Sequence, residues 1–253
     1  MTAPQDRPAA IILAAGRGTR LRPLTDLLPK ALCPVANRAL VDHALDAVTP
    51  YAGEVAVNTH HGRDAVLAHL AGRGVHVSVE TGEPLGTAGG VGNLRGWVDG
   101  RPVLVTNADA WRSGDLSALV DGWDGERVRL LCVQDPAQGD FGPLRYAGAG
   151  LLPWRHVRDL SPEPSGLYEV LWRDEEVAGR LDLVTTEAIF IDCGTPRDYL
   201  RANLTANGGH SVIGADAVVE GEVVRSVVWP RSRVERGERL VDAVRAGDLT
   251  VHT

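Results

Sequence analysis

A glycine loop that carries four cations follows the first apolar stretch of the sequence. The cations are Arg17, Arg20, Arg22 and Lys30. Glycines at positions 16 and 18 let the backbone approach a ligand closely and turn N–H groups toward it, which suits a phosphate chain. Arg20 offers a planar fork for two phosphate oxygens and Lys30 a compact point charge. Fixed cations of this kind neutralise charge that develops on a transferring phosphoryl or nucleotidyl group. Arg17 and Arg22 are equally compatible with solvated surface positions.

Two better-known phosphate motifs do not describe this loop. After Gly16-x-Gly18 the third glycine of a dinucleotide-binding fingerprint is replaced by Leu21. The chain then continues through three prolines instead of turning straight into a helix. The spacing Gly-x4-Gly-Lys-Ser/Thr of a P-loop NTPase is absent. Of the 26 Lys+Arg residues, 25 are arginines, and Lys30 is the only lysine. The one side-chain ammonium group of the sequence therefore lies in this proline-framed loop.

Two aspartates are candidates for a metal site. Asp109 and Asp192 each follow or end a predicted strand, where open α/β sheets bind ligands. Mg²⁺ is commonly held by one or two carboxylates, while substrate phosphates and water complete its coordination. The adjacent His60 and His61 lack a third ligand at a suitable spacing, so they do not predict a zinc site.

The elements that must position these residues alternate between strands and helices, which predicts an α/β sheet, mostly parallel, with helices on its faces. The predicted strands are Ile11–Leu13, Glu54–Val57, Val75–Val79, Val103–Thr106, Val128–Val133 and Ala188–Asp192. The predicted helices are Leu40–Val48, Arg63–Ala71, Ala88–Trp97, Leu116–Trp123 and Thr195–Thr205, the last with Thr195 and Pro196 at its start.

The pattern changes near Asn207, and we expect a domain over residues 1–206 and a short β segment over 207–253. Apolar residues there recur every six positions with one three-residue slip: Ile213, Val219, Val228, Val234 and Leu240. A six-residue period is typical of β-helix coils, of which about two fit; irregular strands packed on the main domain are the alternative. Because a short stack of coils leaves an end uncovered, self-association through this segment is a prediction.

Composition excludes several classes. The 253 residues have a net charge of −7 and no Lys/Arg cluster of the size that a duplex-binding surface needs, although local basic groups still suit a small phosphate ligand. No apolar run approaches the roughly 20 residues of a membrane helix. Residues 1–8 lack the pattern of a secretory leader. Three scattered cysteines without a Cys-x-x-Cys pair indicate reduced thiols, so we expect a cytoplasmic protein without membrane or nucleic-acid partners.

The run LAAGRGTRLRPLTDLLPKALCPV, residues 13–35, resembles the N-terminal motif of the sugar-1-phosphate nucleotidyltransferases. Segments 83–89, 103–109 and 190–196 agree with further motifs of that family in the same order. The resemblance covers nearly the whole chain. It implies a Rossmann-like, mostly parallel mixed sheet flanked by helices, with a short C-terminal segment like a left-handed β-helix. It also implies Mg²⁺-dependent transfer of a nucleotidyl group from a nucleoside triphosphate to a sugar-1-phosphate, in nucleotide-sugar biosynthesis.

The same resemblance implies roles for individual residues. Arg20, Lys30 and Asp109 would be catalytic, and Asp109 and Asp192 would hold Mg²⁺. The residues expected around the nucleotide are Leu13, Ala14, Ala15, Gly16, Arg17, Gly18, Thr19, Gly86, Thr87 and Asn107. Gly86 and Thr87 belong to the family segment that faces the nucleobase. That segment suggests guanine as the base and a mannose-like sugar, while uracil and thymine remain alternative bases. The segment is also compatible with an ordinary loop at the start of a helix.

The chain departs from the family pattern near its centre. Many relatives carry a Glu-Lys-Pro segment whose lysine binds the sugar phosphate, and this sequence has none. The shortening resembles a compact branch that contains N-acetylmuramate-1-phosphate uridylyltransferase and guanylyltransferase-like proteins. Arg145, with Arg173 behind it, and Gly148 are candidates for the sugar phosphate, and Glu169 for sugar hydroxyls; the alternative is that they are surface residues. A catalytically weak regulatory subunit and a transferase for a non-sugar phosphate such as phosphocholine are the competing functions.

Overall fold

The computed structural model describes residues 7–253, so most of the expected non-secretory leader lies outside the described residues. The chain forms two compact units. We call them the sheet unit, with described residues 7–16, 44–108 and 114–189, and the coil unit, with residues 17–43, 109–113 and 190–253. The division into domains at residues 206 and 207 stays a prediction.

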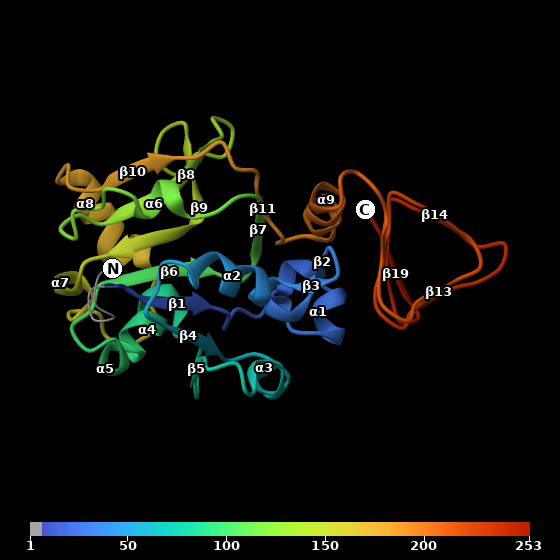
Figure 1. Ribbon diagram of the computed structural model, residues 1–253, viewed down its shortest axis with the longest axis horizontal. Coiled ribbons are helices and arrows are strands. Elements are labelled where there is room, and N and C mark those ends of the chain that lie inside the picture. The colour runs from blue at the N-terminus through green and yellow to red at the C-terminus, as the bar shows by residue number, and fades with distance from the viewer. Residues whose placement is uncertain (1–6) are drawn as a thin grey trace. The chain divides into compact units, whose positions relative to one another are not determined.

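A seven-stranded sheet forms the centre of the sheet unit, in the order β10-β8-β9-β6-β1-β4-β5 (Figure 1). Four of its six neighbouring pairs are parallel, and β9 is antiparallel to both β6 and β8. The strands are β1 (Ala9–Leu13), β4 (Glu54–Thr59), β5 (His76–Val79), β6 (Val103–Asn107), β8 (Arg129–Gln134), β9 (Leu144–Leu152) and β10 (Asp182–Thr185). This arrangement confirms the predicted mostly parallel mixed sheet.

Helices flank this sheet (Figure 1), and apolar side chains of its strands and of these helices share a buried cluster. They are α3 (Arg63–Leu70), α4 (Gly86–Asn93), α5 (Arg95–Val98), α6 (Ser117–Val120), α7 (Trp154–Val157), the π-helix η4 (Tyr168–Trp172) and α8 (Arg173–Val177). Helix α2 (Leu40–Val48) joins residues of both units. The single helix predicted over Ala88–Trp97 is wrong in its extent, because the chain breaks at Leu94 into α4 and α5.

Glycines on one side of α4 let another chain segment run directly against the helix. A Cβ on Gly86, Gly89 or Gly92 would lie 2.5, 2.2 or 2.6 Å from the carbonyl oxygens of Ser165, Glu163 and Ser161 respectively. These distances are shorter than a carbon atom tolerates, so only glycine fits there. The segment from residue 161 to 165 is therefore fixed against α4 by backbone contact.

The coil unit begins with a run of short elements after the glycine loop. These are the 3-10 helix η2 (Thr19–Leu21), α1 (Leu24–Leu27), the 3-10 helix η3 (Lys30–Leu32) and the hairpin of β2 (Pro34–Val35) and β3 (Arg38–Ala39). Strand β7 (Ala110–Arg112) pairs antiparallel with β11 (Phe190–Asp192), and α9 (Pro196–Ala206) follows. Thr195 caps α9 by accepting the Asp198 N–H at 3.2 Å, as the sequence predicts.

The strand ending at Asp192 was predicted correctly, but its assignment to the main sheet was wrong. It forms a separate two-stranded sheet with β7, which the sequence did not predict. The pairing partner has only three residues, and so short a segment carries no periodic signal.

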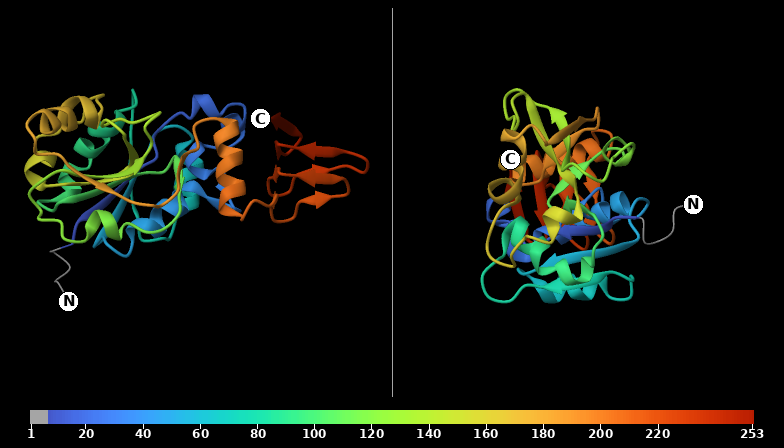
Figure 2. Two further views of the ribbon diagram at one scale, coloured as in Figure 1. Left: turned by 90° about the horizontal axis from the view of Figure 1, so that it is seen from above. Right: turned by 90° about the vertical axis from the view of Figure 1, so that its left-hand side faces the viewer.

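The C-terminal residues wind into β coils, seen nearly along their axis in Figure 1 and from the side in Figure 2. The strands are β12 (Val212–Ile213), β13 (Val218–Val219), β14 (Glu222–Val224), β15 (Val227–Val228), β16 (Arg233–Val234), β17 (Arg239–Val241), β18 (Ala243–Ala246) and β19 (Leu249–His252). Equivalent strands of successive coils pair in parallel, and β19 turns back antiparallel to β18. This is the expected β-helix-like segment.

The six-residue period has different consequences in the first and second coils. Val228, Val234 and Leu240 form a buried cluster inside the coils. Ile213 pairs with Val228 and Val219 with Val234, yet Ile213 and Val219 are 40% and 38% exposed. The first coil has no preceding coil to cover it, so its apolar side chains stay accessible. Self-association through this end stays a prediction.

Candidate active site

Lys30 lies at the start of η3 and is nearly buried, with its side chain 7% exposed. Gly18, at φ +63°, makes room for it: a Cβ there would lie 3.0 Å from both Lys30 Cβ and Thr25 Cγ2. Thr25 holds the turn by donating its hydroxyl to the Gly18 carbonyl at 2.9 Å. The glycine loop thus packs over the aliphatic stem of Lys30 and directs the ammonium group to one place.

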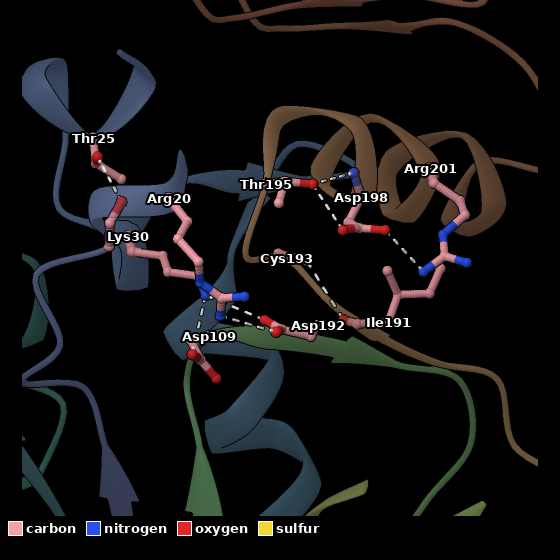
Figure 3. Close-up of polar contacts among 11 residues, drawn as sticks. Arg20, Thr25, Lys30, Asp109, Ile191, Asp192, Cys193, Thr195, Asp198 and Arg201 are labelled. Carbon is pink, nitrogen blue, oxygen red and sulfur yellow. Dashed lines mark hydrogen bonds and ion pairs between the residues drawn. The ribbon is translucent and has the colours of Figure 1, made fainter. Parts of the chain in front are cut away.

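The Lys30 ammonium contacts both predicted metal ligands (Figure 3). Its Nζ lies 3.0 Å from Asp109 Oδ2 and 3.4 Å from Asp192 Oδ1. The β7–β11 ladder brings the two carboxylates together, since Asp192 pairs with Ala110 and the Cys193 N–H donates to the Asp109 carbonyl at 3.1 Å. Two aspartates 83 positions apart in sequence are therefore neighbours across one short ladder.

Arg20 adds a second, exposed cation to this cluster. Its Nη2 lies 3.3 Å from Asp192 Oδ2, and its side chain is 69% exposed (Figure 3). Gly194 leaves the space for this pair, because a Cβ there would lie 2.9 Å from Arg20 Nη2 and 3.1 Å from Asp192 Oδ2. A solvent-exposed ion pair of this kind contributes little to stability. The guanidinium is consequently available to a ligand.

The electrostatics favour a charged lysine. Burial lowers the pKa of Lys30, but the charges of Asp109 and Asp192 outweigh that effect, and the pKa is raised. Burial raises the pKa of the neighbouring Cys33 thiol to about 12 and also raises that of Cys193. Both thiols are therefore neutral near pH 7, and all three cysteines are free and buried. Free, buried cysteines are consistent with the expected reduced thiols.

In the sheet unit, four residues expected near the nucleoside, Leu13, Ala14, Ala15 and Asn107, lie at the carboxyl ends of the adjacent strands β1 and β6. Leu13 at the end of β1 is in register with Asn58 on β4 and with Asn107 on β6. Asn58, 1% exposed, accepts the Ala14 N–H at 2.7 Å and donates to Glu80 Oε1 at 2.7 Å. Asn107 is half-buried, while Ala14 and Ala15 are buried.

Glu80 connects this edge to the predicted base-facing segment. It is 2% exposed, and its Oε2 accepts the Leu85 N–H at 3.0 Å, one residue before Gly86. Gly90 is required beside it, since a Cβ there would lie 2.6 Å from Asn58 Nδ2. Neither Asn58 nor Glu80 was predicted from the sequence. A polar residue inside an apolar strand, as at Asn58 in β4, was the available signal.

Thr87 holds the segment that leads to Glu169. Its hydroxyl accepts the Leu167 N–H at 2.8 Å, and Ser165 bonds to the backbone of Leu85 and Ala88 at 3.0 Å each. The exposed Glu169 lies in η4, two residues after Leu167. The structure therefore brings Gly86 and Thr87 close to the segment that carries one predicted sugar-binding residue.

The other sugar-phosphate candidates lie on or beside β9. Arg145 is half-buried and paired with Asp135 at 3.4 Å. Gly148 adopts φ +72°, and its carbonyl accepts the Thr106 hydroxyl at 3.0 Å. Arg173 is exposed and its guanidinium donates to the Glu169 carbonyl at 3.4 Å.

The remaining predicted loop residues are accessible. Gly16, Arg17 and Thr19 are exposed, and no heavy atom lies within 4 Å of a Cβ built on Gly16. Arg22 pairs with Asp26 at 3.0 Å on the surface, which supports the solvated interpretation for this arginine.

The donor set fits Mg²⁺. Two carboxylates that face one common point supply hard oxygen ligands, and substrate phosphates would supply the rest. Among residues 7–253 no group of three or more His, Cys, Asp and Glu side chains is arranged to hold a metal, so the His60–His61 pair forms no such cluster. Asp109 and Asp192 are the residues that would hold the ion.

Comparison with known proteins identifies the family. A model of the MobA-like NTP transferase domain matches residues 10–248. The chain belongs to this family. N-acetylmuramate alpha-1-phosphate uridylyltransferase of Caulobacter vibrioides is 32% identical over 76% of this chain and 94% of its own length. Mannose-1-phosphate guanylyltransferase of Mycobacterium tuberculosis is 32% identical over 96% of this chain and 73% of its own length.

A solved structure shows the same fold. HddC from Yersinia pseudotuberculosis superposes with a TM-score of 0.64 at 21% identity, over 79% of this chain and 99% of that one. The predicted membership in the sugar-1-phosphate nucleotidyltransferases is confirmed by these relatives. Within the described part of this NTP transferase domain, no helix is both long and apolar enough to cross a membrane.

Proposed function

We propose that the protein transfers a nucleotidyl group from a nucleoside triphosphate to a sugar-1-phosphate. The observation that carries this proposal is the buried Lys30 ammonium held by Asp109 and Asp192. An oxygen of the sugar phosphate attacks the α-phosphorus and forms the new P–O bond. The bond from that phosphorus to its bridging oxygen breaks, and pyrophosphate leaves. No protein nucleophile is needed, because the attacking phosphate is already anionic at neutral pH.

Lys30 and Arg20 would hold the triphosphate by charge, the first as a fixed buried ammonium and the second as an exposed fork. Asp109 and Asp192 would hold Mg²⁺, which when bound neutralises phosphate charge and orients the reacting groups. Lys30 keeps the two carboxylates close together in the unliganded protein, since each contacts its Nζ. Preorganisation of this kind lowers the reorganisation that catalysis requires.

The nucleoside would contact the edge formed by Leu13, Ala14, Ala15 and Asn107, with Gly86 and Thr87 facing the base. Support comes from the Asn58–Glu80 hydrogen bonds, which tie Ala14 to Leu85. The exposed loop residues Gly16, Arg17 and Thr19 would contact the phosphates. The half-buried Gly18 would contact them too, and it also makes room for Lys30.

Glu169 would bind sugar hydroxyls, and Arg145 and Gly148 would lie near the sugar phosphate. They are proposed because the chain lacks the family's Glu-Lys-Pro lysine. Arg145 is already paired with Asp135, so a sugar phosphate would have to compete with this carboxylate for the guanidinium.

We propose GTP and a mannose-like sugar phosphate as substrates, on the strength of the Gly86 segment and the Mycobacterium tuberculosis guanylyltransferase. The Caulobacter vibrioides uridylyltransferase supports UTP as the second candidate. The test incubates the protein with Mg²⁺, each common nucleoside triphosphate and either a panel of sugar-1-phosphates or phosphocholine, and measures pyrophosphate. Release only with phosphocholine would favour a non-sugar acceptor, and no release with any pair would favour a regulatory subunit.

A further inference from the structure

Tyr199 of α9 forms a buried hydrogen-bonded link within the coil unit. The residue is 0% exposed. Its hydroxyl donates to the Pro34 carbonyl in β2 and accepts the indole N–H of Trp229 at 3.0 Å. Trp229 directly follows β15, so one phenol oxygen joins the coils to the strand that follows the Lys30 helix.

Asn203, one turn further along α9, makes a second link to the same hairpin. It is 0% exposed, accepts the Ala36 N–H at 3.0 Å and donates to the Tyr199 carbonyl at 3.0 Å. Ala36 and Asn37, the hairpin's central residues, have φ of 49° and 64°. Alanine adopts this left-handed conformation only where the surroundings impose it. The N–H bond to Asn203 is one such constraint.

The coils make a third contact with the hairpin and share its apolar core. The Asn37 side chain donates to the Ile213 carbonyl in β12 at 2.8 Å. One apolar cluster contains residues of the Lys30 loop and of the coils together: Leu21, Leu24, Cys33, Val35, Val212, Val227, Trp229 and Val244. The β2–β3 hairpin and the segment before it therefore rest on the C-terminal coils.

Lys30 is only four residues from Pro34, and the intervening backbone is tight. The Leu32 N–H donates to the Pro29 carbonyl at 2.8 Å and the Cys33 N–H to the Lys30 carbonyl at 3.0 Å. A single hydrogen-bonded turn therefore separates the hairpin from Lys30, so a shift of the hairpin would reach the Lys30 backbone.

We propose that the C-terminal coils position Lys30, with Tyr199 and Trp229 as positioning residues that act through the Pro34 carbonyl. The catalytic consequence rests on the proposed nucleotidyl transfer. In this proposal the coils contribute to catalysis by holding Lys30 in place.

The test compares Tyr199→Phe and Trp229→Phe with a matched control, Trp123→Phe, in the full-length protein. Each positioning variant removes one hydroxyl or indole donor and keeps an aromatic ring. Trp123 also donates its indole N–H to a backbone carbonyl, that of Arg127 at 2.8 Å, but within the sheet unit. Hydrogen exchange of residues 31–36 and pyrophosphate release are measured on all three variants.

We expect exchange at residues 31–36 to rise at least about tenfold in both positioning variants, with β1 and β6 unchanged. We expect kcat to fall about tenfold, since small displacements of a charged group are costly in such reactions. The control should change neither quantity. If Tyr199→Phe exchanges throughout because it unfolds, Trp229→Phe decides, since it retains the Tyr199–Pro34 hydrogen bond.

Exchange at residues 31–36 equal to that of the control would overturn the proposal. So would raised exchange with an unchanged kcat, since the hairpin would then move without moving Lys30. A parent protein that releases no pyrophosphate would refute the proposed function instead, and the exchange of residues 31–36 would still decide whether the coils hold the hairpin.

Discussion

Replacing Lys30 by methionine tests the electrostatic centre of the site. Methionine keeps a stem that fills the space beneath Gly18, and it removes the charge. At distances of 3.0 and 3.4 Å, Coulomb's law with an effective dielectric constant of about 20 gives roughly 5 kcal/mol for each ion pair. Desolvation of the buried ammonium offsets much of this, and the 45% exposed Asp109 is partly screened by water. We therefore expect a net loss of about 2 kcal/mol in the free energy of unfolding.

The loss of activity should be larger than the loss of stability. Removing one preorganised group that stabilises developing charge lowers kcat by about a hundredfold to a thousandfold, equivalent to roughly 3–4 kcal/mol. Pyrophosphate release is measured for Lys30→Met and for Arg22→Met, a surface cation of the same loop paired with Asp26. The control should stay within about twofold of the parent, as surface substitutions usually do. A Lys30→Met enzyme that keeps more than one tenth of the parental kcat, while folded, would refute the reasoning.

Lys30→Met should also change the alkaline limb of the stability profile. The pKa of Lys30 is raised in the folded protein above its ordinary value of 10.5. Its charge therefore stabilises the fold fully below pH 10.5, and this contribution is lost as the pH rises through the folded-state pKa. Urea unfolding measured as the pH rises above 10.5 should show a decline in the parent that the variant lacks, and equal slopes would contradict this assignment.

Four further changes test other parts of the structure. Asp109→Asn should lower turnover by about a thousandfold with an unchanged circular dichroism spectrum; near-parental rates would remove Asp109 from the site. Gly18→Ala should lower kcat about tenfold because its Cβ would displace Lys30, whereas Gly179→Ala, also at positive φ but with open space around its Cβ, should affect stability alone. Glu80→Gln turns an amide toward a buried donor and should raise the KM for the nucleoside triphosphate about tenfold; an unchanged KM would separate Glu80 from nucleotide binding. Burial lowers the pKa of His156, because the folded protein favours the neutral imidazole. The free energy of unfolding is therefore unaffected by this residue above pH 6.5 and falls as the pH drops below that value. His156→Phe should flatten urea unfolding between pH 5 and 6.5, and an unchanged slope would contradict this assignment.

The sequence predicted the parts of the site that contiguous motifs encode. The glycine loop, Lys30 and the aspartate after β6 lie in short segments in which residue type and neighbours specify the chemistry. Asn58 and Glu80 were not predicted, because they act through hydrogen bonds between distant parts of the sequence. Asn58 bonds to Ala14, 44 positions away, and to Glu80, 22 positions away. The sheet register sets such pairings; the local sequence signals at most a polar residue inside an apolar strand, as at Asn58, and does not name its partners.

The coil unit shows the same limit. The six-residue period correctly predicted the coils, since a repeat is a local property. It could not predict that Tyr199 and Trp229 meet, because that contact depends on how α9 packs against the coils, β18 among them. Nor could it predict that β11 leaves the main sheet to pair with a three-residue strand.

The buried lysine also makes the protein unusually simple to label. Apart from the terminal amine, Lys30 provides the one primary amino group in the sequence. An amine-directed reagent such as an aldehyde or an activated ester therefore finds a single side-chain target. That target is shielded by the glycine loop and held protonated by two carboxylates, so its reaction rate reports the opening of the loop. A mass increase of one adduct, mapped to residue 30 and suppressed by nucleoside triphosphate, would register ligand binding without any engineered probe.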